Sequence, residues 1–502
     1  MQKRNTNLFK TVVENISTIH GTAHLAEKNG NTRLIWGLLM TANIALTIFF
    51  GMIIKNKFNE DQIITQINAN CKVSEVPFPA VSICNFNTIS LKETKYIERL
   101  LLSYNRNQSE INNFFRDLVY LKNYGVNSTH TGHYKHIMRL LKHHYFTIET
   151  IMEDLHQKCE NLLLYCSFNR KQKNCNDIFG LIKTSHGYCC AFNYVALHDG
   201  IDDNLLLNDE NLEYYEDRSD DKLPGFRIVA TSESGRTSGL HVVFNVEPDD
   251  YPSYATVPYF GANVLLSDPT DYPETTVLYE FVAPGDSLDM KVEPLVFQPD
   301  YWIRNAEISK RACWFHDEIQ LEHTDKYSFE TCITECMMRM FINACGCVPY
   351  KYPRLKTHRI CEFEDLNCLH NVTIYKPLKP RECKPKCYME CSDKKYIMKS
   401  NTVPFLIETI PASVLAGQNI SELTSLRVFF GRPTCNCYRS HFLIDINYMI
   451  GMFGGILSLS FGGSMLSVIE VTWLLISALF LLLWRVCMKC LRNYAHSKIN
   501  HK

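Results

Sequence analysis

The chain lacks an excess of charge of either sign, and it lacks the short motifs that mark common enzymes. Its 502 residues include 52 Lys and Arg against 53 Asp and Glu, and the net charge of −1 gives no support for nucleic-acid binding. No Gly-rich phosphate loop, G-x-S-x-G or H-E-x-x-H sequence occurs, so we predict no catalytic residues and no enzyme activity. There is no internal repeat or low-complexity tract, and 46% hydrophobic residues are too many for a disordered chain.

Cysteine, in contrast, is abundant. The chain has 21 cysteines, and all but two lie between Cys71 and Cys437. An extracellular protein uses this density as a disulfide framework, whereas a cytosolic protein rarely carries it. In the cytosol the cluster at residues 313–391 would suggest a zinc site, but outside the cell disulfides are the better interpretation. Spacing alone does not assign the pairs.

Two long apolar runs indicate membrane spans. Residues 34–54 contain no charge and would form a helix of ~32 Å, about one hydrocarbon core. This run follows a mostly polar tail and is too long for a signal peptide, so we expect an uncleaved span. Residues 449–484 contain one charge, Glu470, and as one helix would measure ~54 Å, more than one crossing. The sequence Gly-Gly-Ser at 462–464 is the natural place for a break.

Charge next to the runs predicts the orientation. Both tails are rich in Lys and Arg, and the positive-inside rule places them in the cytoplasm. We therefore predict a plasma-membrane protein with two spans and cytoplasmic termini. Its parts are an N-terminal tail (1–33), a first transmembrane helix (34–54), an extracellular cysteine-rich domain (55–447), a second transmembrane helix (448–484) and a C-terminal tail (485–502).

The predicted extracellular part has a mixed pattern of helices and strands. Residues 226–230, 240–246 and 264–267 are rich in β-branched and aromatic residues and predict strands. The spacing of apolar residues predicts helices over 94–120 and 136–153. An α+β body is therefore expected.

Sequons and histidines supply candidate modification and metal sites. Four Asn-x-Ser/Thr sequons fall in the predicted extracellular part and are candidate glycosylation sites: Asn107, Asn127, Asn371 and Asn419. A group of histidines suggests a metal at first sight: His130, His133, His136, His143 and His144. Their spacing does not place three on one helical face, so we predict a solvated surface, no bound metal and no cofactor.

Four elements occur in the order of a known family. His20-Gly21, before the first span, resembles a His-Gly gating motif, and residues 78–85 (FPAVSICN) resemble the FPAVTxCN element that follows the span. The cysteine block and the Gly-rich second span come next. On these elements the chain resembles the degenerin/epithelial sodium channel superfamily of amiloride-sensitive sodium channels, and it is most similar to the insect pickpocket branch. The resemblance implies the acid-sensing/epithelial sodium channel fold, in which two transmembrane helices flank a large disulfide-rich ectodomain.

The resemblance also implies disulfide pairs. Cys84 would pair with Cys189 or the adjacent Cys190. The other implied pairs are Cys166–Cys175, Cys313–Cys391, Cys332–Cys387, Cys336–Cys383, Cys345–Cys368 and Cys347–Cys361. The remaining cysteines are Cys71, Cys159, Cys190, Cys435 and Cys437, an odd set in which at least one is free or intermolecular.

Small residues repeat along one face of the second run: Gly451, Gly455, Ser458 and Gly462. This pattern is also typical of simple helix packing in membranes. The resemblance favours a pore instead, because Gly462, Gly463 and Ser464 align with the family's selectivity tract. Backbone carbonyls in such a tract can replace the water around a small cation.

Further pore and gate roles follow from the resemblance. Gly451 aligns with a position where a bulky side chain holds related channels open. Glu470 would form a cation-attracting ring at the inner mouth, or alternatively bond to a neighbouring helix. His20 and Gly21 would line the inner vestibule as a re-entrant turn; without the resemblance they are an ordinary cytoplasmic loop.

Some features of the family, including several of its acid-sensing channels, are missing. Residues 63–64 are Ile-Ile and 69–70 are Ala-Asn where those channels carry a His pair and an acidic pair, so proton gating is not supported. Lys310 occupies the place of a Trp that joins the ectodomain to the spans, and Trp473 occupies that of a second pore acid. No Arg-x-x-Arg sequence occurs, which argues against the furin-type cleavage that activates some epithelial sodium channel subunits.

We therefore predict a subunit of a homo- or hetero-trimer of related channel subunits, with sodium as the permeant ion and block by amiloride. An extracellular chemical, osmotic or mechanical stimulus would open it, and the sequence does not specify the ligand. A non-conducting receptor or auxiliary subunit that needs a partner to form a pore is the alternative. A two-span ectoenzyme is a weaker one.

Overall fold

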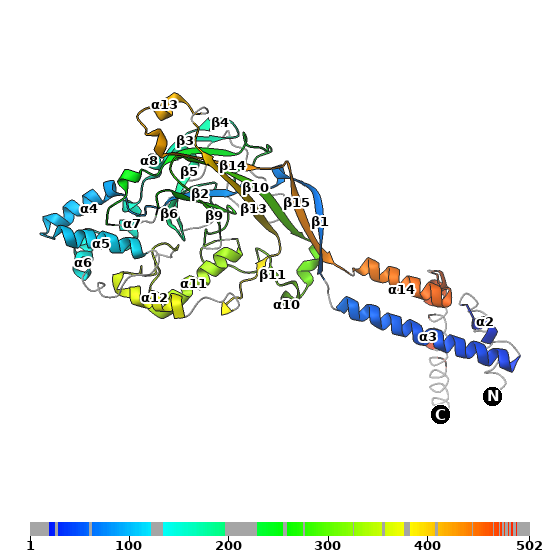
Figure 1. Ribbon diagram of the computed structural model, residues 1–502. Helices are drawn as coiled ribbons and strands as arrows, with labels where there is room; N and C mark the ends of the chain where they lie inside the picture. The colour runs from blue at the N-terminus through cyan, green and yellow to red at the C-terminus, as the bar shows by residue number, and fades with distance from the viewer. Residues whose placement is uncertain are drawn as a thin grey trace, which may run out of the picture. The chain divides into compact units, whose positions relative to one another are not determined.

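The computed structural model divides the chain into two units (Figure 1), one formed by residues 1–64 and 441–502 and the other by residues 65–440. The described residues are 20–25, 29–59, 63–121, 134–195, 228–254, 259–274, 277–324, 326–353, 357–375, 382–406, 410–443, 445–464, 466–470, and 472, 473, 476, 480, 483, 484 and 488.

The first unit is built from two apolar helices. Helix α3 (Gly30–Asn59) is the one helix among the described residues that is long and apolar enough to cross a membrane, and α14 (Ile446–Phe461) is a shorter apolar helix. They lie side by side and run antiparallel, because Asn43 Nδ2 donates to Ser460 O (3.4 Å) while Gly51 lies against Phe453. The short helix α2 (Thr22–Leu25) packs on α3.

The second unit contains an eight-stranded sheet in the order β1-β15-β10-β14-β7-β3-β4, with β13 also paired to β10. Its strands are β1 (Ile63–Lys72), β3 (Leu163–Phe168), β4 (Lys171–Lys173), β7 (Leu240–Asn245), β10 (Asp286–Pro299), β13 (Asp393–Pro404), β14 (Leu423–Phe430) and β15 (Thr434–Phe442). The long strand β10 pairs with three others along its length, antiparallel with β13 and parallel with β14 and β15.

A second, five-stranded sheet has the order β5-β6-β2-β8-β9. Its strands are β5 (Phe179–Thr184), β6 (Gly187–Phe192), β2 (Ala80–Asn85), β8 (Ala262–Ser267) and β9 (Leu278–Val282). Phe78, the first residue of the FPAV element, is fully buried, and its ring lies 5.2 Å from that of Phe168 and 6.0 Å from that of Phe192. Because these partners belong to different sheets, Phe78 joins the sheets through the core.

Helices form a second core beside the sheets. They are α4 (Leu91–Ser103), α5 (Gln108–Tyr120), α6 (Lys135–His143), α7 (Ile148–Leu155), α11 (Phe329–Cys345) and α12 (Leu366–Tyr375). Phe114 of α5 packs on Phe363, just before α12, with ring centroids 5.6 Å apart. Shorter elements are α8 (Cys159–Leu162), α9 (Cys175–Ile178), α10 (Ile308–Arg311), α13 (Ala412–Leu415), β11 (Cys313–Trp314) and β12 (Met389–Glu390).

The mixed α+β class is as predicted, but each long predicted helix is two helices. The break in 94–120 falls at Asn105, which adopts a positive φ of 55°, and the side chain of Asn107 then caps α5. The break in 136–153 is followed by a capping box between Thr147 and Thr150 that starts α7. Apolar spacing continues through both turns, so periodicity alone did not reveal them. In the predicted strand 226–230, the described residues 228–230 make only an isolated bridge, Pro77 to Ala230.

Nine disulfides cross-link the second unit. Seven are pairs that the resemblance implies: Cys84–Cys189, Cys166–Cys175, Cys313–Cys391, Cys332–Cys387, Cys336–Cys383, Cys345–Cys368 and Cys347–Cys361. The other two are Cys71–Cys435 and Cys159–Cys190. Among the described cysteines, Cys437 is free and buried.

Candidate functional site

Helix α14 ends at the Gly-Gly-Ser tract. Gly462 has a φ of +64°, a left-handed conformation that glycine adopts without a Cβ penalty. Its N–H donates to Ser458 O (2.8 Å), and the N–H of Gly463 donates back to Leu457 O (3.3 Å). These bonds close the last turn of the helix, so α14 covers ~24 Å and stops at the tract.

A new helical segment begins at Ser464. Its Oγ accepts from the N–H of Ser467 (3.3 Å), its own N–H donates to Ser467 Oγ (3.2 Å), and its carbonyl accepts from the N–H of Val468 (3.2 Å). This is a reciprocal helix N-cap, and residues 466–470 are helical. Within the three residues of the tract, helix α14 ends and a second helical segment begins. The apolar run is therefore broken at the Gly-Gly-Ser sequence, as predicted.

The His-Gly turn lies against this break. The N–H of His20 donates to Phe461 O (3.0 Å), one of the carbonyls at the end of α14. A Cβ added to Gly462 would come within 1.9 Å of His20 Nδ1, so the absence of a side chain at Gly462 makes the approach possible.

The turn itself also needs glycine. Gly21 has a φ of +89°, and a Cβ there would lie 3.0 Å from Met40 Sδ on α3. On α2, the ring of His24 stacks on Trp36 of α3, with centroids 4.4 Å apart. The structure therefore holds together two motifs from opposite ends of the sequence, His20-Gly21 and Gly462-Gly463-Ser464.

The remaining pore candidates lie exposed within the single chain. A Cβ added to Gly451 or Gly455 would meet no atom of the described residues within 4 Å, and Ser458 is also exposed on α14. This face has room for another helix. Glu470 lies on the helical segment 466–470 with its side chain exposed.

Three of the four sequons are accessible. Asn107, Asn371 and Asn419 are exposed, whereas Asn127 lies outside the described residues. Asn419 caps a short turn by accepting from the N–H of Ser421 (3.4 Å).

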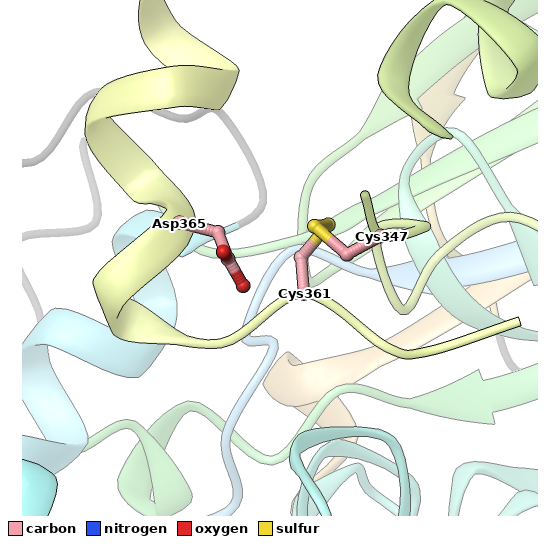
Figure 2. Close-up of side chains that lie close together, drawn as sticks. All are labelled: Cys347, Cys361 and Asp365. Carbon is pink, nitrogen blue, oxygen red and sulfur yellow. A yellow bond between two sulfur atoms is a disulfide. The ribbon is translucent and has the colours of Figure 1, made fainter. Parts of the chain in front are cut away.

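The described residues that could bind a metal ion make other interactions. Cys347, Cys361 and Asp365 lie close together, but the two sulfurs form a disulfide, as Figure 2 shows. The Asp365 carboxylate forms a two-pronged ion pair with Arg359 (2.8 and 2.9 Å). Of the predicted histidine surface, His130 and His133 lie outside the described residues, and His144 Nε2 lies 3.0 Å from Tyr104 Oη.

Sequence reasoning missed an acidic cavity of about 260 Å³ in the second unit, which Asp268, Asp271, Glu390 and Asp393 help to line. Burial, with the charge of Asp393 nearby, raises the pKa of Glu390 to about 8, although the N–H of Phe329 donates to its carboxylate (2.8 Å). Burial also raises the pKa of Asp271 and Asp393. The acids come from two distant segments that only the fold brings together, so no local motif marked them.

Comparison with known proteins gives a consistent result. Residues 14–474 match the family model described as "Amiloride-sensitive sodium channel". Pickpocket protein 28 of Drosophila melanogaster is 29% identical over 487 residues, covering 91% of this chain and 76% of the relative. Sodium channel protein Nach of the same organism is 23% identical over 469 residues, covering 91% and 85%. Pickpocket protein 11, also from this fly, is 24% identical over 473 residues, covering 91% and 73%. The resemblance seen in the sequence is confirmed: the chain belongs to the amiloride-sensitive sodium channel family, a family of membrane channels and not of enzymes.

Proposed function

We propose that this protein is a subunit of a trimeric, sodium-selective and amiloride-sensitive cation channel opened by an extracellular stimulus. Channels of this family are trimers, so three copies of α14 would surround one axis. The observation that carries the proposal is the break at Gly462–Ser464, where one helical segment ends, another begins, and the N–H of His20 donates to the carbonyl of Phe461.

The break gives the chemistry of a filter. Backbone carbonyls that leave a helix can coordinate a cation in place of water, and such backbone is tolerated at membrane depth only beside a cavity or within protein. The small residues on the open face of α14 would pack against neighbouring subunits or line the pore on the extracellular side of the filter. They are Gly451, Gly455 and Ser458. Glu470 would concentrate cations at the inner mouth.

The predicted topology supports an extracellular stimulus. Basic residues flank the spans on the side of both tails, so the cysteine-rich unit would face outward, where disulfides form. The antiparallel course of α3 and α14 suits a chain whose ends share one side of the membrane. A chemical, osmotic or mechanical signal would act on this unit in homomeric or heteromeric trimers.

The test is voltage clamp of cells that express the full chain with Gly451→Val. A bulky side chain on the open face of α14 should obstruct close packing of neighbouring helices and favour the open state. We expect a resting current that falls when sodium is replaced and when amiloride is added. Met452→Val, which places the same side chain about 100° around the helix, is the matched control and should leave the resting current low.

Surface expression of each variant is measured in parallel. A sodium current in Gly451→Val supports a self-sufficient channel. Silence at normal surface expression would instead favour the alternative function, an auxiliary subunit or receptor, and co-expression with related subunits would then be the deciding recording.

A further inference from the structure

Two neighbouring aromatic side chains project from the second unit without cover. Tyr301 is 76% exposed and Trp302 is 58% exposed, and their rings meet edge to face with centroids 5.7 Å apart. Each ring offers a large apolar area and carries a polar N–H or O–H group at its tip.

The turn that carries them is rigidly held. Asp300 caps it by accepting from the N–H of Tyr301 (2.8 Å), and Ile303 is buried at 2% exposure. Arg304 forms an ion pair with Asp317 and lies over the ring of Phe315 (4.9 Å). The exposed rings therefore project from a turn that a cap, a buried side chain and an ion pair hold in place.

The turn follows strand β10, which pairs with β15. Strand β15 leads to α14 along the chain, and β1 follows α3. The N–H of Asp300 donates to Ser440 O (2.8 Å), and β15 is also the partner of β1. From Ser440 the chain reaches the first residue of α14, Ile446, in six residues, which span at most ~20 Å. On the other side, α3 ends at Asn59, and β1 begins at Ile63.

We propose that Tyr301 and Trp302 insert into the headgroup region of the outer lipid leaflet and anchor the second unit to the membrane surface. Amphipathic Trp and Tyr rings concentrate in this region, where the ring is apolar and the N–H or O–H stays hydrated. The anchor rests on the proposed topology. It supplies this chain with a membrane contact close to its spans, at a turn that the sequence pattern did not single out.

The test uses the full chain in phosphatidylcholine nanodiscs with and without brominated acyl chains, which quench Trp fluorescence on contact. The difference between the native chain and Trp302→Phe isolates the emission of Trp302 from that of the other four Trp residues. We expect this component to emit at shorter wavelength than Trp in water and to lose most of its intensity in brominated lipid. The control is Tyr145→Trp in the Trp302→Phe background, because Tyr145 is 93% exposed on the α6–α7 turn. This new Trp should emit as in water and resist the lipid quencher.

Two results would overturn the anchor. Quenching of the Trp302 component by acrylamide in water, but not by brominated lipid, would show an open surface. Resistance to both quenchers would show that protein, and not lipid, covers the ring of Trp302. Because quenching does not require current, a silent channel with a quenched Trp302 would count against the proposed function alone.

Discussion

At the scale of single residues, Gly462 meets two separate demands. Its φ of +64° favours glycine, and the ring of His20 occupies the space that any side chain would need. Gly463 next to it has neither constraint, since a Cβ there would lie 3.5 Å from Leu457 O, an ordinary contact. Adjacent glycines of one tract therefore differ in what they tolerate.

We expect Gly462→Ala to disrupt the tract and Gly463→Ala to preserve it. In the Gly451→Val background, Gly462→Ala should reduce the sodium current at least tenfold or change its ion preference, and His20→Ala should restore part of it by removing the clash. Whole-cell recordings with sodium and potassium outside measure both effects. Equal currents from Gly462→Ala and Gly463→Ala would contradict the geometry of the turn.

The raised pKa of Glu390 predicts how the stability of the folded chain depends on pH. Its pKa of about 8 in the folded chain exceeds its ordinary value of 4.5, so between these pH values the folded state binds more protons than the unfolded state. The contribution of Glu390 to stability should therefore fall as pH rises from 5 to 8. Replacement by Gln removes this titration, so the stability of Glu390→Gln relative to the native chain should be greater at pH 8 than at pH 5.

Thermal unfolding of the purified full chain at pH 5 and pH 8 measures this difference. The control is Glu160→Gln, the same substitution at an exposed position that does not line the acidic cavity. The prediction is wrong if the native chain and Glu390→Gln lose stability in parallel.

The sequence alone pointed to most of the candidate residues, but it did not predict which of them lie in contact. The motifs at His20-Gly21 and Gly462–Ser464 were recognisable by resemblance, and the glycine and serine caps follow known helix-end preferences. The bond from His20 N–H to Phe461 O joins distant parts of the chain, and no local pattern encodes it. The acidic cavity was missed for the same reason.

At the scale of elements, a buried ion pair connects helix α7 to strand β5 of the five-stranded sheet. Lys183 on β5 donates to Glu149 on α7 (2.5 Å), and their side chains are 5% and 11% exposed. Removing one member of such a pair takes away the opposite charge beside the other buried group, which costs about 3–5 kcal/mol, whereas apolar replacement of both is often tolerated.

Lys183→Met should therefore lower the Tm of the full chain clearly, and adding Glu149→Met should recover most of the loss. A double-variant cycle by thermal unfolding gives the coupling. If the two losses simply add, the contact between α7 and β5 does not depend on this pair.

Element boundaries also show the limit of periodicity. The helical spacing over 94–120 and 136–153 correctly indicated helices, but Asn105 and Thr147 divide them by local backbone and capping geometry. In 449–484 the break was predictable, because a single helix would have exceeded the bilayer and glycine marked the place.

At the scale of the whole molecule, the fold class and family were predictable, whereas the sheet order was not. Apolar runs, cysteine density and the FPAV element are local in sequence, and together they indicated two spans and an α+β body. Strand order depends on pairing between distant segments, such as β10 with β14 and β15, which alternation within a strand cannot specify.

The disulfide between Cys71 and Cys435 has a consequence for the integrity of the polypeptide. It joins positions 364 residues apart, one shortly after α3 and one shortly before α14. A protease that cuts once anywhere between these cysteines produces two fragments, each carrying one apolar helix, yet the fragments stay linked by the bond. Nicked protein would therefore migrate as one chain until it is reduced, and a cleaved subunit would keep both of its helices in the same assembly.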